Sequence, residues 1–91
     1  MRRRRLPTIS RFYGIRIGMF HREHAPPHFH ARYGEYTTVI GINPVSVLQG
    51  GLPRRAQSLV LEWTALHQAE LADNWRRAQN GQPLQPIDPL D

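Results

Sequence analysis

A chain of 91 residues with no cysteine is long enough for one domain with one small core, and neither disulfides nor thiolate metal ligands stabilise it. No stretch approaches the roughly 20 apolar residues that cross a bilayer, and no signal peptide follows the N-terminal arginines, so we expect a cytoplasmic protein outside membranes. The formal net charge is +5, and residues 1–55 carry ten of the 12 arginines against two glutamates. This imbalance indicates an anionic partner, RNA or DNA, although a GC-rich genome and ordinary solubility produce the same composition.

The chain begins with a run of four arginines that is expected to be extended and mobile, because like charges repel. We therefore assign residues 1–7 to a basic flexible arm and count Arg3 and Arg4 among the candidates for nucleic-acid binding. From Phe12 to Phe20 apolar residues alternate with polar or small ones, which predicts a half-buried strand. Arg16, within that strand, is a further candidate for a phosphate contact.

Four of the five histidines fall within residues 21–30, around Pro26-Pro27, which cannot donate ladder hydrogen bonds and therefore indicate a loop. The segments 28–33 and 36–42 are predicted strands, and Gly34-Glu35 between them is typical of a type II′ hairpin turn. The register that follows pairs Tyr33 with Tyr36, Ala31 with Thr38 and Phe29 with Ile40 on the core face, and Arg32 with Thr37, His30 with Val39 and His28 with Gly41 on the other.

The second face of this hairpin carries His28, His30 and Arg32 in a row. Gly41 is expected to leave open space opposite His28, since glycine has no side chain there. A short fourth strand is predicted over Ser46–Gln49, after the turn at Asn43-Pro44.

Apolar residues recur at intervals of three and four after Pro53, which suits a first helical position, and Gly81 is the expected stop. This pattern predicts one helix from about Pro53 to Asn80, with Trp63, Trp75 and His67 on its core-facing stripe. Arg54 and Arg55 lie in its first turn, where the helix dipole disfavours cations, so both are candidates for nucleic-acid binding. Residues 82–91 contain three prolines and are predicted to be an extended tail whose Leu84, Ile87 and Leu90 dock along an apolar groove.

These elements predict one α+β domain over residues 8–81, between the arm and the tail. Its three- or four-stranded antiparallel meander would pack on one long C-terminal helix. The histidine face would then be open or covered by a partner or by the tail.

Several strings carry a resemblance to a known family: Pro7-Thr8-Ile9-Ser10-Arg11-Phe12-Tyr13-Gly14-Ile15, His24-Ala25-Pro26-Pro27-His28-Phe29-His30-Ala31, Tyr33-Gly34-Glu35-Tyr36, and Leu52-Pro53-Arg54-Arg55 with Glu62-Trp63 and Asn74-Trp75. From Pro7 to about Leu90 the chain resembles the small bacterial family catalogued as domain of unknown function 4160. The resemblance implies an adjacent second small gene, commonly of the family domain of unknown function 2442, in an arrangement similar to a toxin–antitoxin module. It implies a cognate small protein as partner and assigns no catalytic residue.

Two chemistries fit the histidine face. A metal-independent ribonuclease needs one imidazole to take the 2′-hydroxyl proton, a second to protonate the leaving oxygen and a guanidinium to bind phosphate. His28, His30 and Arg32 supply this set. In the alternative, no catalysis occurs and the loop is a rigid element whose imidazoles hydrogen-bond nearby carbonyls, or a surface that only binds nucleic acid or a protein.

Metal binding is the other chemistry. His24, His28 and His30 could ligate zinc or nickel through imidazole nitrogens, and His21 or Glu23 could complete the shell. Against this interpretation, the spacing of the histidines matches no standard zinc motif.

We therefore expect a small basic component of a two-gene, toxin–antitoxin-like module that acts on RNA or binds nucleic acid through the His28, His30 and Arg32 face. No cofactor is expected unless the histidines hold zinc or nickel. The alternative is a non-enzymatic interaction or regulatory protein that binds a cognate small protein, and the oligomeric state is left open.

Overall fold

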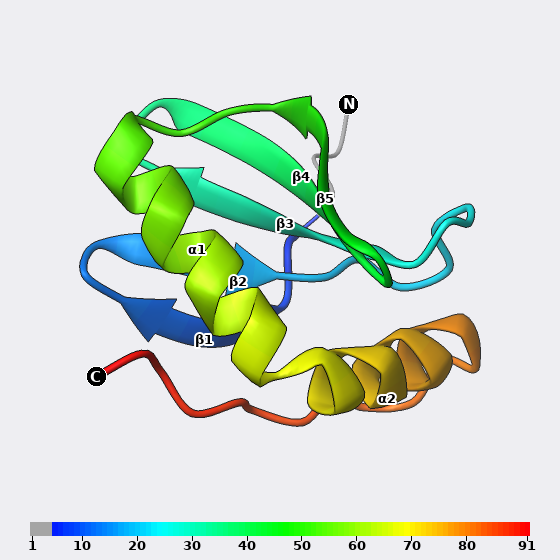
Figure 1. The fold of residues 1–91 in the computed structure, drawn as a ribbon. Coiled ribbons are helices and arrows are strands. Elements are labelled where there is room, and N and C mark those ends of the chain that lie inside the picture. The colour runs from blue at the N-terminus through cyan, green and yellow to red at the C-terminus, as the bar shows by residue number, and fades with distance from the viewer. Residues whose placement is uncertain (1–4) are drawn as a thin grey trace.

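The computed structural model describes residues 5–91, which form a five-stranded antiparallel sheet in chain order and two helices (Figure 1). The elements are β1 (Thr8–Phe12), β2 (Ile15–Gly18), β3 (His28–Tyr33), β4 (Tyr36–Ile42), β5 (Val45–Gly50), α1 (Arg54–Leu66) and α2 (Gln68–Gln79). The α+β class and the antiparallel meander are confirmed, whereas the sheet has five strands rather than three or four. Arg3 and Arg4 lie outside the described residues. No helix among residues 5–91 is long and apolar enough to cross a bilayer.

The predicted strand over Phe12–Phe20 is confirmed only in part: β2 lies within this range, but a turn precedes it and separates it from β1. Tyr13 and Gly14 have positive φ angles of 49° and 78° and connect β1 to β2. Two central residues at positive φ are typical of the turn that joins a tight hairpin. The alternation of apolar residues continues past the turn, so periodicity alone does not show where the chain reverses.

The predicted pairing of β3 with β4 is confirmed at all six positions. Phe29, Ala31 and Ile40 are fully buried on the core face, as expected from this register. Tyr33 and Tyr36 pair beside the turn but are 37% and 50% exposed, so they lie beyond the core.

The space opposite His28 is filled, contrary to the prediction. A Cβ at Gly41 would lie 2.8 Å from Ser46 Oγ and 3.5 Å from Leu48 Cδ1. The side chains of Ser46 and Leu48 on β5 occupy this space, so a larger residue at position 41 would have to displace the Ser46 hydroxyl.

The predicted single long helix is also wrong, because His67 separates α1 from α2. A straight helix from Pro53 to Asn80 would run about 40 Å, longer than the largest Cα extent of the molecule, 34 Å. The break lets α1 cross one face of the sheet while α2 packs at the end of the sheet (Figure 1). Gln68 Nε2, at the start of α2, donates a hydrogen bond of 2.7 Å to the carbonyl oxygen of Ile42.

Trp63 lies at the centre of the core and is fully buried, as predicted. Its ring packs against Phe12 and Phe29 at centroid distances of 5.4 and 5.7 Å. The His67 ring packs on the Trp63 ring at a centroid distance of 5.3 Å, and its Nδ1 forms a hydrogen bond of 2.6 Å with Glu70 Oε1. His67 is therefore a half-buried residue at the helix break rather than a core histidine within one helix.

The tail is extended and docks on the core, as predicted. Ile87 is buried, and its N–H donates to the carbonyl oxygen of Ile9 at 2.8 Å. Trp63 Nε1 donates to the carbonyl oxygen of Asp88 at 2.8 Å. Leu84 and Leu90 pack against the same core. The three apolar residues of the tail, spaced three apart, therefore all contact the domain, as expected.

Leu6 and Pro7, predicted to belong to the flexible arm, are part of the folded domain. Leu6 is only 2% exposed, and a Cβ at Gly18 would lie 2.4 Å from Leu6 Cγ. The carbonyl oxygen of Pro7 accepts a hydrogen bond of 3.1 Å from Met19 N–H. Leu6 thus packs over the sheet where β2 lacks a side chain.

Candidate functional site

The loop between β2 and β3 is held by the C-terminal end of α2. Arg22 N–H donates to the carbonyl oxygen of Ala78 at 3.2 Å, and Gln79 Nε2 donates to the carbonyl oxygen of Glu23 at 3.0 Å. These contacts fix the backbone of Glu23 although it lies outside any helix or strand. The position of the Glu23 side chain therefore depends on the helix break that brings α2 to this end of the sheet.

Glu23, His28 and His30 meet in one cluster, which we call the Glu-His cluster. Glu23 Oε1 lies 3.0 Å from His28 Nε2 and 2.8 Å from His30 Nε2. The three side chains are 18%, 11% and 21% exposed, respectively. β3 positions the two imidazoles on the face opposite Phe29, as the predicted register requires, and the loop adds the carboxylate.

The hydrogen bonds of His28 define where its hydrogens lie. Its Nδ1 lies 2.7 Å from the carbonyl oxygen of Pro26, which can only accept, so Nδ1 carries a hydrogen. Its Nε2 faces the Glu23 carboxylate, which also only accepts when ionised. Both ring nitrogens of His28 are thus engaged, and an incoming group reaches Nε2 only by displacing its hydrogen bond to Glu23.

Aromatic side chains enclose the two imidazoles. The His28 ring lies 5.2 Å from the Trp75 ring of α2 and 5.3 Å from the His30 ring. Phe20 meets His30 edge-on at a centroid distance of 4.9 Å. Such walls limit the rotamers of both histidines and keep the cluster in one geometry.

The pKa of Glu23 is lowered from its ordinary value. Burial on its own would raise this pKa, but the hydrogen bonds and positive charges of His30 and His28 together outweigh burial. The carboxylate is therefore ionised at neutral pH, which suits an acceptor shared by two imidazoles.

A row of three arginines crosses the same face of the sheet, and we call Arg11, Arg16 and Arg32 the arginine row. Arg11 on β1 pairs with Arg16 on β2, and Arg16 pairs with Arg32 on β3. Adjacent strands lie about 4.8 Å apart, so the backbone positions of the three arginines span about 10 Å across the sheet. Among residues 5–91, no carboxylate forms an ion pair with any of the three.

Arg16, at the centre of the row, is fixed in place by hydrogen bonds and repelled by neighbouring arginines. Its Nε donates to Thr8 Oγ1 at 2.7 Å, and its Nη2 donates to the carbonyl oxygen of Leu6. Its pKa is lowered, first by burial and then by repulsion from Arg11, Arg32 and Arg5. The guanidinium still stays charged, because the ordinary pKa of arginine is far above neutral.

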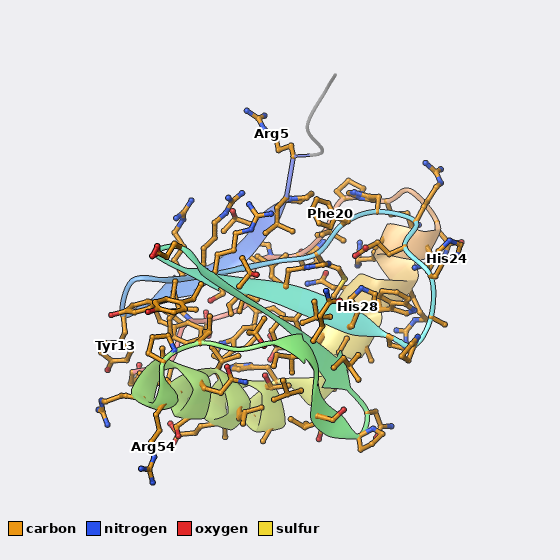
Figure 2. All side chains as sticks on the ribbon, turned by 90° about the horizontal axis from the view of Figure 1, so that it is seen from above. Arg5, Tyr13, Phe20, His24, His28 and Arg54 are labelled. Atoms are coloured by element: carbon orange, nitrogen blue, oxygen red, sulfur yellow. The ribbon has the colours of Figure 1, made fainter. Side chains whose placement is uncertain are left out.

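The arginines predicted from the sequence to bind nucleic acid do not all lie on one surface. Arg54, in the first turn of α1, lies on the side of the molecule opposite Arg5 (Figure 2). Arg55 lines a separate surface pocket with Tyr13 and Tyr33. Arg16 therefore shares a face with Arg32, whereas Arg54 and Arg55 belong to another part of the surface.

His24, proposed as a metal ligand, is exposed at the outer edge of the loop, away from His28 (Figure 2). His21 also lies outside the cluster, and its Nε2 donates to the carbonyl oxygen of Gln82 at 3.0 Å. His28 and His30 do converge, and the acid between them is Glu23. From the sequence, Glu23 is predicted only as an optional ligand, although it is the only acidic residue among the first 34.

Arg11 was missed because β1 was not predicted, so its register opposite Arg16 was unknown. The signal that could have found it is Tyr13-Gly14, read as a turn between two arginine-bearing strands.

Comparison with known proteins places the chain in a family. No curated protein and no solved structure matches it. One family does match, over residues 14–76, a segment that contains the whole Glu-His cluster together with Arg16 and Arg32. Since this match covers about two thirds of the chain, the protein belongs to the family described as Domain of unknown function (DUF4160).

Proposed function

We propose that this protein binds nucleic acid through the outer face of β1, β2 and β3, as the small basic component of a two-gene, toxin–antitoxin-like module. The observation that carries the binding proposal is the arginine row, with Arg5 close enough to repel Arg16. The two-gene arrangement rests on the family resemblance alone.

We expect the arginine row to lower stability when no anion accompanies it. Like charges directly opposite each other on paired strands are destabilising, and here two such pairs share Arg16. A phosphate backbone brings a series of negative charges that would convert this repulsion into attraction. The row therefore suits a polyanionic partner better than it suits an isolated domain.

Contacts of this kind hold the backbone and do not read bases. The flanking residue on β4 is Thr37, opposite Arg32, and it offers a hydroxyl rather than an aromatic ring for stacking. We therefore expect RNA and DNA single strands of equal length to bind with similar affinity and strong salt dependence.

Metal-independent ribonuclease activity receives less support from the geometry. General acid and base catalysis needs an imidazole nitrogen within reach of the substrate. In His28 one ring nitrogen faces Pro26 and the other faces Glu23, and only 11% of its side chain is exposed. Binding is thus the better-supported half of the proposal.

The test compares two charge-matched double variants in a fluorescence anisotropy titration with labelled single-stranded RNA over a range of salt concentrations. Arg11→Gln with Arg32→Gln removes two exposed members of the row, and Arg54→Gln with Arg55→Gln removes the same charge from α1. We expect the first variant to lower the slope of log K against log salt by about 1.4, the value for two lost phosphate contacts on a single strand. The α1 variant should bind nearly as the unmodified protein does.

Two results would overturn the binding proposal: no RNA or DNA binding by the unmodified protein at low salt, or equal losses in the two variants. Equal losses would mean that net charge alone, rather than the row, attracts the nucleic acid.

The predicted cognate protein needs a separate experiment. Co-expression with the adjacent small gene should yield a complex that survives purification. If the two proteins form a complex and the unmodified chain binds no nucleic acid, the alternative of a purely regulatory interaction protein replaces our proposal.

A further inference from the structure

We propose that the Glu-His cluster is a binding site for one divalent transition-metal ion of the Zn²⁺ class, held by a carboxylate oxygen of Glu23 and by Nε2 of His28 and His30. This inference goes beyond nucleic-acid binding, because none of the three ligands belongs to the arginine row.

The distances between the ligand atoms suit such an ion. One ligand atom from each residue lies within 4.8 Å of the other two, and Glu23 Oε1 is 2.8 and 3.0 Å from the two Nε2 atoms. Ligands about 2.0–2.1 Å from a tetrahedral zinc ion are roughly 3.3 Å apart. The two carboxylate–imidazole distances therefore need to lengthen by only about half an ångström or less for the carboxylate and the imidazoles to share one ion.

The hydrogen bond at the far side of His28 is the kind that metal ligands make. Its Nδ1–H donates to the carbonyl oxygen of Pro26 at 2.7 Å, which directs Nε2 toward Glu23. Metal-bound imidazoles commonly donate their other N–H to a carbonyl or carboxylate, which fixes both the tautomer and the ring orientation.

The donor set also identifies the class of ion. Two imidazoles and one carboxylate suit zinc, nickel and related transition metals, whereas calcium and magnesium prefer an all-oxygen shell. Three protein ligands leave a fourth position of a tetrahedral ion for water or another small ligand. The partial exposure of all three side chains, between 11% and 21%, gives that position a path to solvent.

The surrounding structure holds the ligands in place before any ion arrives. Both histidines lie on β3 two residues apart, and the backbone of Glu23 is tied to α2 through Gln79. Trp75 and Phe20 pack on the two rings. A site of this kind loses little conformational entropy on binding, so a well-defined affinity is expected.

The experiment uses the full chain without a histidine tag, stripped of metal by a chelator and titrated with ZnCl₂ in a calorimeter. We expect one ion per chain. With free Zn²⁺ at 100 times the dissociation constant, the melting temperature should rise by about 10 °C or more for a domain of this size. Co²⁺ in place of Zn²⁺ should give the visible absorption of a low-symmetry site, and Zn²⁺ should abolish it.

Glu23→Gln is the decisive variant, because it keeps the side-chain shape and a hydrogen-bond acceptor but removes the anionic ligand. We expect Glu23→Gln and His30→Ala each to weaken Zn²⁺ binding by about 10-fold to 100-fold or more. Removing a residue that only hydrogen-bonds a metal ligand already causes a loss of this size. His24→Ala is the matched control, since it removes an exposed histidine from the same loop and should leave the affinity unchanged. Circular dichroism establishes that each variant is folded. If His30→Ala is unfolded, the Zn²⁺ affinity of Glu23→Gln alone tests the proposal.

The proposal is overturned if the unmodified chain shows neither Zn²⁺ binding nor a rise in melting temperature at micromolar metal. It is equally overturned if His24→Ala weakens binding as much as Glu23→Gln does, because exposed histidines would then account for the binding. Loss of metal binding has no bearing on the RNA titration of the arginine-row variants, so the two proposals can fail separately.

Discussion

At the scale of single residues, the Glu23 carboxylate organises the part of the surface next to the arginine row. One of its oxygens accepts from both His28 and His30, and the aromatic rings on either side exclude much of the water. A partly buried hydrogen bond to a charged group contributes more to stability than one between neutral groups, and its loss leaves donors without a partner.

Replacing Glu23 with alanine should lower the free energy of unfolding by about 2 kcal/mol, because two imidazole N–H groups lose a charged acceptor. The measurement is urea denaturation in the presence of a chelator. Glu35→Ala, at the exposed tip of the β3–β4 hairpin, is the control and should change stability by less than about 0.5 kcal/mol. Equal effects of the two variants would show that the carboxylate has no structural role.

Gly18 is a residue where the close approach of another segment excludes a side chain. A Cβ there would lie 2.4 Å from Leu6 Cγ and 2.7 Å from the carbonyl oxygen of Pro7. We expect Gly18→Ala to destabilise the fold by about 1–3 kcal/mol, as overpacking does. At Gly51 a Cβ would meet nothing within 4 Å, so Gly51→Ala should be nearly neutral in the same denaturation assay. A neutral Gly18→Ala would contradict the packing of Leu6 on the sheet.

At the scale of elements, the helix break and the tail determine which side chains meet. α1 supplies the core with Trp63, and α2 turns away to hold the β2–β3 loop. The tail then covers both helices: Asn74 Oδ1 accepts from Gln85 N–H and its Nδ2 donates to the carbonyl oxygen of the same residue. Without the tail, this buried asparagine would lack both partners.

Ile87→Ala should therefore destabilise the protein by about 2–4 kcal/mol, the usual cost of a buried isoleucine cut to alanine. Thermal or urea unfolding measures this loss. Leu66→Ala, which removes a leucine that is 67% exposed at the end of α1, is the control and should change little. A change at Ile87 as small as that at Leu66 would mean that the tail is not docked in solution.

The elements differ in how far the sequence predicts them, for physical reasons. The β3–β4 hairpin is predicted in full because Gly34-Glu35 is a recognisable turn and the flanking alternation then determines every pair. The β1–β2 hairpin is missed because the alternation of apolar residues continues through Tyr13-Gly14 and hides the turn there. The helix break is missed because the apolar stripe continues from Trp63 to Leu71, and the contacts that hold α2 in its new direction, such as Gln68 to Ile42, are tertiary.

In the candidate site, too, the sequence predicts what local register determines and misses what tertiary contacts determine. The directions of His28, His30 and Arg32 follow from local register and are predicted. The positions of Glu23 and Arg11 depend on α2 and on β1, so local patterns do not give them.

At the scale of the whole molecule, helix α1 covers one face of the sheet, and the arginine row lies on the other. Arg5 and Arg54 mark the two sides in Figure 2. The acidic residues lie mainly after residue 56, in the helices and the tail, which leaves the face of β1, β2 and β3 basic. Such a separation of charge orients a polyanion toward one side of the protein before contact.

The most direct test of the nucleic-acid proposal is an NMR titration of the ¹⁵N-labelled protein with single-stranded RNA, followed through the arginine Nε–Hε signals. The account predicts that the signals of Arg11, Arg16 and Arg32 shift together with a common affinity while those of Arg54 and Arg55 remain in place. Shifts confined to Arg54 and Arg55, or of similar size at all five residues, would contradict it.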